Sequence, residues 1–245
     1  QRAGPGLGNI WPEQSDYNMV VKGGGHGNYA NITLVPASVQ EMFDFTKHAF
    51  TLADRYRMTV FILSDAYIGQ MMEPVNISGP VLHGACKDWA VRGDAATRKN
   101  LITSIHMSPS LQRKHNEELQ SVYRQVASEL VDFESFGTED AQVVFVAYGI
   151  VSRICRSAVH QLREMGIKAG MLRLKTVYPF PDEEIARLVD AGKHLIAVEL
   201  SNGQMANDVS LAAGNRSSVS RHLTMGGETP SVEQLVSFAV QRSAR

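Results

Sequence analysis

The 245-residue sequence has little of what builds metal centres or disulfide frameworks. It contains two cysteines, Cys86 and Cys155, which lie far apart and match no metal-binding or redox spacing. Its eight histidines are scattered, and none stands beside a cysteine or a carboxylate at the spacing of metal ligands. We therefore expect no metal site within this chain, and a reduced protein of the cytoplasm.

Charge and hydropathy also exclude several kinds of partner. The formal net charge is −1, so nothing favours binding to nucleic acid or to an anionic membrane. No apolar run approaches the ~20 residues that cross a bilayer. The chain opens inside a loop, without Met and without the basic and apolar regions of a signal peptide. We interpret it as a polypeptide whose preceding part is missing or is supplied by another chain.

The most informative segment that is present is a loop formed by the first eight residues. Gly4, Pro5 and Gly6 give it a tight backbone path that lets a ligand approach closely. Arg2 offers a planar fork of donors that fits a carboxylate or a phosphate at two points. An anion-binding loop is one interpretation, and an ordinary surface turn with a solvated arginine is the other.

Hydrophobic periodicity predicts an α/β protein. A strand at residues 32–35 precedes an amphipathic helix over residues 39–56, for which Ser38 and Glu41 form a capping box. The continuous apolar run at residues 58–63 is typical of a strand buried on both faces. A strand, a helix and a strand at this spacing form a parallel unit.

The remainder of the chain predicts a linker and a second α/β domain. Glycine and proline punctuate the linker, which also carries a charged helix near residues 110–128. Repeated strand–loop–helix units then predict a small doubly wound sheet. Its strands are expected at residues 143–147, 169–174 and 195–199, and its helices at about 152–165, 182–191, 204–213 and from 230. The predicted division of the chain is 1–75, 76–138 and 139–245.

Few side chains suggest chemistry. A glycine cluster surrounds His26, which either contacts an active site or belongs to an ordinary flexible loop. Glu13, Asp16 and Glu73 could act as acids or bases, yet no pairing among them is evident. Glu199, at the end of a predicted strand, is either a functional group or a capping carboxylate. No nucleophile and base are recognisable, so the chain looks like the binding half of a site, with no catalytic residue of its own.

Several short blocks resemble the alpha subunits of 2-oxoacid:ferredoxin oxidoreductases. The loop Gln1–Gly8 resembles that family's Gln-Arg-Gly-Gly-Pro loop, and its Gly-Leu-Gly ending is most similar to the branched-chain, 2-ketoisovalerate type. Further similar blocks follow in order at residues 14–17, 22–27, 36–42, 69–74, 87–90, 146–149, 178–181, 198–205 and 225–227. Together these blocks span nearly the whole chain, which makes the resemblance specific.

The resemblance implies a fold, an activity and a set of partners. Part of a pyrimidine-binding thiamine diphosphate domain would precede a transketolase C-terminal-like domain. The enzyme would decarboxylate a 2-oxoacid, transfer the acyl group to coenzyme A and reduce ferredoxin. The beta subunit would hold the diphosphate end of the cofactor and its Mg²⁺. The partners would be the beta, gamma and delta subunits of the same complex, and [4Fe-4S] clusters would lie on partner subunits. Arg2 would bind the substrate carboxylate, within the loop of Gly4, Pro5 and Gly6.

Some features of the family do not occur in this sequence. The Tyr-Pro-Ile-Thr-Pro loop, and the glutamate that activates the aminopyrimidine ring, would both precede residue 1. We therefore expect this chain alone to be inactive. Ala3 stands where the family usually has glycine, which favours a slightly reshaped loop because alanine tolerates positive φ less well.

Two alternative functions remain open. The beta subunit of a thiamine-dependent 2-oxoacid dehydrogenase complex has the same domain order but passes its acyl group to a lipoyl domain. The Gln1–Gly8 loop and the glycine cluster around His26 argue against it. The second alternative is a non-catalytic α/β assembly module, which the absence of catalytic groups would fit.

Overall fold

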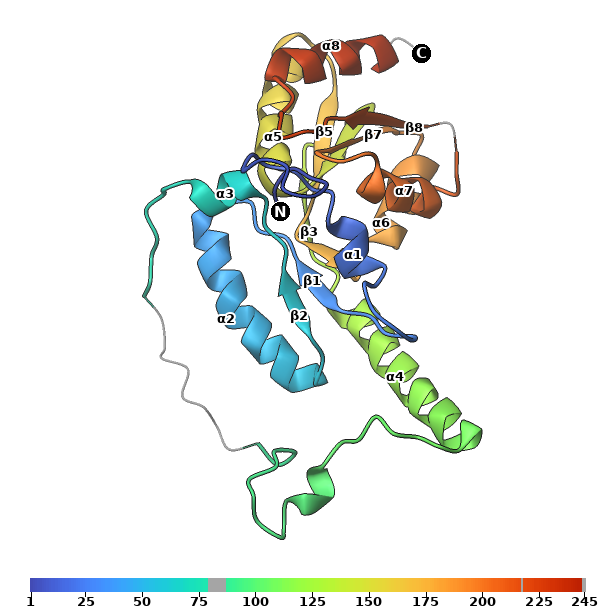
Figure 1. Cartoon of the computed structure of the whole chain (residues 1–245). Coiled ribbons are helices and arrows are strands. Elements are labelled where there is room, and N and C mark those ends of the chain that lie inside the picture. Colours follow the sequence, from blue (N-terminus) through green and yellow to red (C-terminus); the bar gives the residue numbers. More distant parts are fainter. Residues whose placement is uncertain (79–86, 217, 244–245) are drawn as a thin grey trace.

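Two β-sheets of unequal size form the centre of the molecule (Figure 1). The computed structural model describes residues 1–78, 87–216 and 218–243, so residues 79–86 of the predicted linker lie outside the described residues. The smaller sheet consists, in spatial order, of β2 (Val60–Ile62), β1 (Ile32–Leu34) and β6 (Thr176–Tyr178). The larger sheet consists of β3 (Phe133–Phe136), β5 (Ala169–Leu174), β4 (Val143–Ala147), β7 (His194–Glu199) and β8 (Val219–Leu223).

The smaller sheet contains the parallel unit that the sequence predicts. Strands β1 and β2 are parallel and are joined by helix α2 (Val39–Tyr56), which the hydroxyl of Ser38 caps by accepting a hydrogen bond from Glu41 N at 3.1 Å. The prediction that the second strand is buried on both faces is wrong. Strand β2 lies at the edge of the sheet, and the side chain of Phe61 there is 37% exposed. A continuous apolar run shows that a strand is hydrophobic but not whether both of its faces are covered.

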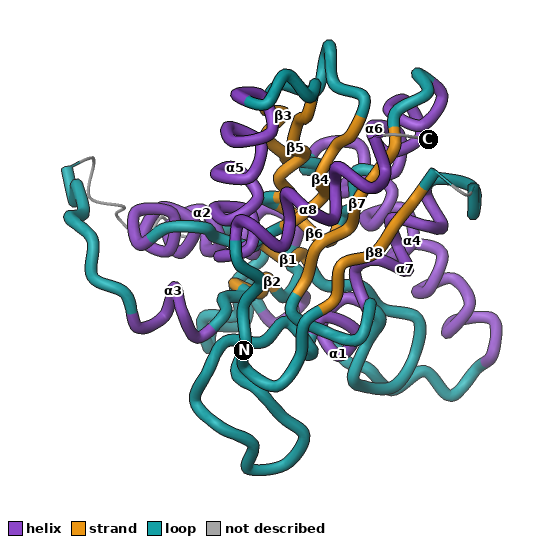
Figure 2. The backbone as a smooth tube through the Cα atoms, turned by 90° about the horizontal axis from the view of Figure 1, so that it is seen from above, coloured by secondary structure: helices purple, strands orange, loops and turns teal. Residues whose placement is uncertain are grey.

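The larger sheet is doubly wound, as predicted. Strands β5, β4, β7 and β8 are parallel, and β3 runs antiparallel along β5. Helices α5 (Gly149–Glu164) and α8 (Val232–Ser243) cover one face, and α6 (Asp182–Asp190) and α7 (Gln204–Ala212) cover the other (Figure 2). Alternate residues of β4 enter two separate cores, with Val144 among the residues of α6 and α7 and Phe145 among those of α5.

Two strands pair with strands on the other side of the predicted division of the chain. Strand β3 begins ahead of residue 139 yet pairs with β5, and β6 leaves the larger sheet after β5 to pair antiparallel with β1. The two sheets therefore share a continuous backbone connection at Lys175. The division of the chain at residue 139 stays a prediction.

The other elements are short or lie outside the sheets. They are α1 (Tyr17–Val21), α3 (Ala66–Gln70), a single 3-10 turn (Arg98–Asn100) and the long charged helix α4 (Pro109–Glu129). In Figure 1 the segment before α4 extends away from both sheets. No helix among the described residues is long and apolar enough to cross a membrane. Cys155 is a buried free thiol in the larger sheet's core, while Cys86 lies outside the described residues.

A buried carboxylate joins the end of β2 to the larger sheet. Asp65 is 2% exposed, and its Oδ1 accepts hydrogen bonds from Tyr67 N and Ile68 N in the first turn of α3. Its Oδ2 accepts a hydrogen bond from Ile150 N in the first turn of α5, at 2.9 Å. Burial raises the pKa of Asp65, although these backbone donors oppose the shift. One side chain, which directly follows the smaller sheet's β2, thus caps both α3 and α5.

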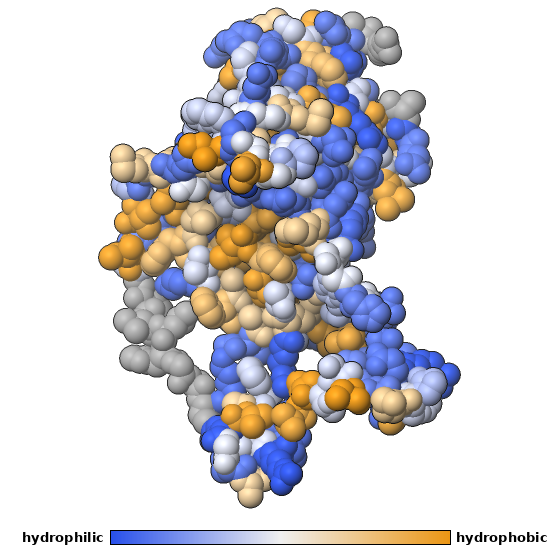
Figure 3. Space-filling view, in the orientation of Figure 1, coloured by the Kyte–Doolittle hydropathy of each residue, from blue (hydrophilic) through white to orange (hydrophobic). Residues whose placement is uncertain are grey.

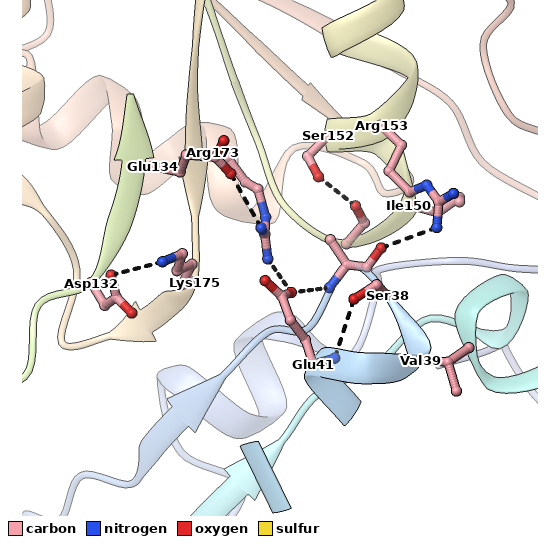
Figure 4. Close-up of polar contacts among 12 residues, drawn as sticks. Ser38, Val39, Glu41, Asp132, Glu134, Ile150, Ser152, Arg153, Arg173 and Lys175 are labelled. Atoms are coloured by element: carbon pink, nitrogen blue, oxygen red, sulfur yellow. Dashed lines mark hydrogen bonds and ion pairs between the residues drawn. The ribbon is translucent and has the colours of Figure 1, made fainter. Parts of the chain in front are cut away.

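An arginine forms a second polar connection between the sheets (Figure 4). Arg173, on β5, pairs through Nη2 with Glu41 of α2 and through Nη1 with Glu134 of β3, the latter at 3.3 Å. The capping-box residue Glu41 also accepts a hydrogen bond from Ala37 N at 2.8 Å. Glu134 is paired in turn with Arg156 of α5. The start of α2 is therefore held against the larger sheet by a bridge of alternating charges.

We predict that the Asp65 connection leaves no room for a side chain at position 149. Gly149 has φ +60°, and a Cβ there would lie 2.6 Å from Asp65 Oδ2. Gly166 also has a positive φ, +80°, but a Cβ there would meet nothing within 4 Å. Gly166→Ala should cost about 1 kcal/mol of unfolding free energy through backbone strain, and Gly149→Ala about 3 kcal/mol because the cap is lost as well. Chemical denaturation measures both, and equal losses would contradict a close contact with Asp65.

The Arg173 bridge should make stability depend on acid pH. Burial alone would raise the pKa of Glu134, but the hydrogen bond and charge of Arg156, with the charge of Arg173, lower it below its ordinary value of 4.5. A lowered folded-state pKa contributes stability above pH 4.5, and that contribution is lost as the pH falls through the folded-state value. Unfolding experiments should show Glu134→Gln less stable than the unaltered chain near neutral pH, with the difference shrinking in acid. The exposed Glu164→Gln serves as control, and a constant difference for Glu134→Gln would contradict the bridge.

Candidate functional site

The predicted anion-binding loop lines a cavity of about 460 Å³. Arg2, Gly4, Pro5 and Gly6, the four loop residues proposed from the sequence, all contribute to its lining. The other lining residues are Glu13, Ser15, Asp16, Asn202, Gln204 and Met225. Asn202 follows β7 and Met225 follows β8, so the cavity lies at the carboxyl ends of the parallel strands. That edge is where open α/β sheets ordinarily bind ligands.

Arg2 is held by the carbonyl groups of its own loop. Its Nη1 donates to Leu7 O and, at 3.2 Å, to Ala3 O, with a longer contact of 3.4 Å to Asn9 O. Its Nη2 donates to Gly6 O at 3.3 Å. None of these hydrogen bonds uses Nε, so within the described part of the chain the Nε–H donor remains for a ligand. A guanidinium anchored by Nη1 can still present its Nε and Nη2 edge to a carboxylate.

The backbone of the loop needs glycine at position 8 and accepts alanine at position 3. Gly8 has φ +47°, and a Cβ there would lie 1.9 Å from Ala3 O. Ala3 is 2% exposed, does not have a positive φ, and pairs with Trp11 through a 2.9 Å hydrogen bond from its N to Trp11 O. The backbone of Ala3 is therefore unstrained. The sequence predicts that Ala3 reshapes the loop, because alanine tolerates positive φ poorly, but residue 3 does not adopt a positive φ.

Glu13 joins the two loops that line the cavity. It is 4% exposed, and its Oε2 accepts a hydrogen bond from Gly4 N at 2.9 Å. Its Oε1 accepts one from Gly226 N at 3.3 Å, and Asn9 Nδ2 donates to Gly226 O at 3.1 Å. A single carboxylate thus fixes the start of the chain against the loop that follows β8. Because both oxygens face backbone N–H groups, Glu13 serves as a connector and not as a free acid or base.

The next residues attach the same segment to the strand ends of the larger sheet. Gln14 is fully buried; its Nε2 donates to Tyr148 O and its Oε1 accepts from Leu200 N. Gln204, at the start of α7, donates from Nε2 to Ser15 O at 2.7 Å and accepts from Asn18 N at 2.7 Å. These amides make the position of the cavity depend on the larger sheet.

Two carboxylates whose roles the sequence did not decide, Glu199 and Glu73, lie outside the cavity lining. Glu199 is fully buried and caps α7, accepting hydrogen bonds from Met205 N at 3.0 Å and from Ala206 N at 2.8 Å. Burial raises its pKa, although those backbone bonds oppose the shift. Glu73 accepts a hydrogen bond from Val39 N and pairs with Arg153 at 2.7 Å, and these two contacts lower its pKa. Both residues are helix caps or bridges, which supports the capping interpretation of Glu199.

His26 is placed apart from the loop residues. It is exposed on the glycine-rich turn after α1 and is absent from the cavity lining. Its contact with an active site stays a prediction. Asp16 does line the cavity, and no hydrogen bond among the described residues uses its carboxylate. Asn202, Gln204 and Met225 were missed as site residues, although the blocks at 198–205 and 225–227 had indicated the two segments that carry them.

The cavity offers one cation and no metal site. Arg2 is the one basic residue in the lining, and it stands with the carboxylates of Glu13 and Asp16. Within the described ranges, no three His, Cys, Asp or Glu side chains are grouped so that they could hold a metal ion. The arrangement can bind and orient an anion through Arg2.

Comparison with known proteins gives two family matches and several relatives. The family described as pyruvate flavodoxin/ferredoxin oxidoreductase, thiamine diphosphate-binding, matches residues 1–134, and the family described as pyruvate:ferredoxin oxidoreductase core domain II matches residues 141–235. The ketoisovalerate oxidoreductase subunit VorB of Methanothermobacter marburgensis is 52% identical over 216 residues, which is 88% of this chain and 61% of that protein. The 2-oxoglutarate synthase subunit KorA of Methanocaldococcus jannaschii is 32% identical over 266 residues, 96% of this chain and 70% of that protein.

A solved structure supports the fold over the whole chain. The 2-oxoglutarate:ferredoxin oxidoreductase from Magnetococcus marinus, with 2-oxoglutarate, coenzyme A and succinyl-CoA bound, superposes with a TM-score of 0.80 at 20% identity. The match covers 100% of this chain and 48% of that one. The chain therefore spans about half of that structure, and about three fifths of the length of the ketoisovalerate relatives that it matches.

We predict that replacing Glu13 loosens both cavity loops. In Glu13→Gln one carboxylate oxygen becomes an NH₂ group that faces a backbone N–H, so one hydrogen bond is lost and a donor is left unpaired. Such a loss costs about 1–3 kcal/mol, which corresponds to local opening that is about fivefold to more than a hundredfold more frequent. Hydrogen exchange at the amides of Gly4 and Gly226 measures it. Asp16→Asn is the matched control in the same cavity, and unchanged exchange in Glu13→Gln would contradict the connector role.

Proposed function

The chain belongs to the pyruvate flavodoxin/ferredoxin oxidoreductase family, and we propose that it acts as the alpha subunit of an enzyme that converts 2-oxoacids to acyl-CoA and reduces ferredoxin. The observation that carries the proposal is the Arg2 cavity, in which the only basic side chain keeps an N–H edge available for a carboxylate. We propose branched-chain 2-oxoacids as substrates, with 2-ketoisovalerate as the first to test, because a relative at 52% identity is named for ketoisovalerate.

The chemistry of this chain would be orientation of the substrate. A carboxylate held on the Nε and Nη2 edge of Arg2 has a fixed direction for the bond that is broken when CO₂ leaves. The loop carbonyls that hold Nη1 fix the guanidinium before the substrate arrives, which lowers the entropy lost on binding. Glu13 and Gln204 keep the surrounding loops in place.

Cofactors would be supplied largely by partners. The family description names thiamine diphosphate, yet the described residues hold no cluster that fits its Mg²⁺. Two cysteines in 245 residues are also too few for one [4Fe-4S] cluster with four thiolate ligands. We therefore propose that a beta subunit holds the Mg²⁺ and the diphosphate, that the other partners are gamma and delta subunits, and that the clusters lie on partner subunits. Coenzyme A would be the acyl acceptor and ferredoxin the electron acceptor.

Exposed apolar side chains support a partner in contact with this chain. The segment before α4 exposes Leu101, Ile102, Ile105 and Met107 by 63–90%. Figure 3 shows further apolar surface over α2 and β2, where Phe61 is exposed. Apolar patches of this kind ordinarily mark a protein interface. Because Cys155 is a free thiol in a cysteine-poor chain, we propose that the complex works in the cytoplasm.

Arg2 variants test the proposed function. A charge-assisted, two-point contact with a carboxylate is worth about 1.5–3 kcal/mol, so Arg2→Ala should lower kcat/KM for the 2-oxoacid by about tenfold to a few hundredfold. Arg2→Lys should also be impaired, because lysine keeps the charge but loses the fork. The assay is coenzyme A-dependent viologen reduction by the assembled complex.

The exposed Arg187→Ala is the control for this assay, since Arg187 pairs with Glu184 and lies outside the cavity lining. An unchanged kcat/KM in Arg2→Ala would refute the carboxylate role. If the complex reduced NAD through lipoamide instead of viologen, it would belong with the dehydrogenase complexes. Failure of the complete assembly to bind thiamine diphosphate would identify a non-catalytic module.

A further inference from the structure

The cavity has an apolar side chain that the carboxylate site does not use. Of its ten lining residues, only Pro5 and Met225 present apolar side chains, and Pro5 belongs to the Arg2 loop itself. Met225 comes from the other end of the chain, in the loop between β8 and α8, and is 57% exposed. One cavity thus combines a cation from the first loop with a thioether chain from the last.

Met225 is fixed by anchors on both sides. Thr224 N donates to Glu199 O at 3.2 Å, and Gly226 N and O bind Glu13 and Asn9. Glu13 also holds Gly4, two residues after Arg2, so the same carboxylate sets the separation between Arg2 and Met225. The backbone position of Met225 is therefore fixed by hydrogen bonds of the residues on both sides.

Close packing at the next residue maintains this arrangement. Gly227 has φ +92°, and a Cβ there would lie 2.5 Å from Trp11 Cβ and 2.9 Å from Asn9 Oδ1. The loop after β8 can approach the first loop this closely only because position 227 carries no side chain.

We propose that Met225 is the specificity-determining residue that selects 2-oxoacids with a neutral alkyl chain. This role rests on the proposed function, because it requires that Arg2 binds the carboxylate of the same acid. A polarizable, flexible thioether packs well against a branched alkyl group. The second carboxylate of a dicarboxylic acid would lose water against the thioether and would lie in the same cavity as the carboxylates of Glu13 and Asp16, so such acids are disfavoured.

The test compares two monocarboxylic 2-oxoacids, whose side chains carry no charge, in the assembled complex with the full-length subunit. Met225→Gln keeps the length of the side chain but makes its end polar. The ratio of kcat/KM for 2-ketoisovalerate to that for pyruvate should fall by about tenfold, the scale of one apolar contact in a pocket. Met165→Gln is the matched control, because Met165 is 55% exposed at the end of α5 and lies outside the cavity.

A second variant moves the methionine without changing it. Gly227→Ala should displace the loop after β8 and lower the same ratio, while leaving the Arg2 loop sequence intact. A fall in both Met225→Gln and Gly227→Ala, with none in Met165→Gln, supports the inference. An unchanged ratio in Met225→Gln, with activity retained, overturns it while the proposed function stands.

Binding of unreactive acids separates this inference from the proposed function. Calorimetry with isobutyrate and acetate reports the alkyl preference of the cavity without turnover. Met225→Gln should reduce the preference for isobutyrate over acetate by the same factor of about ten, and an unchanged preference overturns the role of Met225. A complex that oxidises no 2-oxoacid refutes the proposed function, whatever the binding preference.

Discussion

The carboxylate of Asp65 is the contact on which the arrangement of this molecule depends. It ends the first parallel unit and caps both α3 and α5, so the smaller sheet is tied to the larger one through backbone N–H groups. Gln14 binds Tyr148 O beside the same junction, and Glu13, the adjacent residue, reaches into the cavity. The position of the Arg2 loop therefore follows from how the two sheets meet.

Four carboxylates in this chain, three of them buried, accept hydrogen bonds from the backbone and hold loops and helix starts in place. Asp65, Glu13, Glu73 and Glu199 each accept at least one backbone hydrogen bond at a loop or a helix start. Burial raises the pKa of Asp65 and of Glu199, but both carboxylates accept hydrogen bonds from backbone N–H groups in the first turns of helices. Among the four, Glu13 and Glu199 thus fix a loop and a helix start that line the cavity.

Local sequence patterns predicted most of the helices and the parallel strands β1, β2, β4, β5 and β7. The capping box at Ser38 and Glu41 marks the start of α2, and the apolar runs mark β4, β5 and β7. Strands β3, β6 and β8 were missed, because short strands that pair with distant segments carry no periodic signal of their own. Arg2 could be predicted from its residue type and loop, whereas Met225 could not, since it reaches the cavity only through contacts between the two ends of the chain.

The most direct test of the central claim is a structure of the assembled complex with 2-ketoisovalerate bound in the absence of thiamine diphosphate, so that the acid stays unreacted. The account predicts the carboxylate within hydrogen-bond distance of Nε and Nη2 of Arg2, with the isopropyl group against Met225. A carboxylate bound elsewhere, with the Arg2 loop unoccupied, would contradict it.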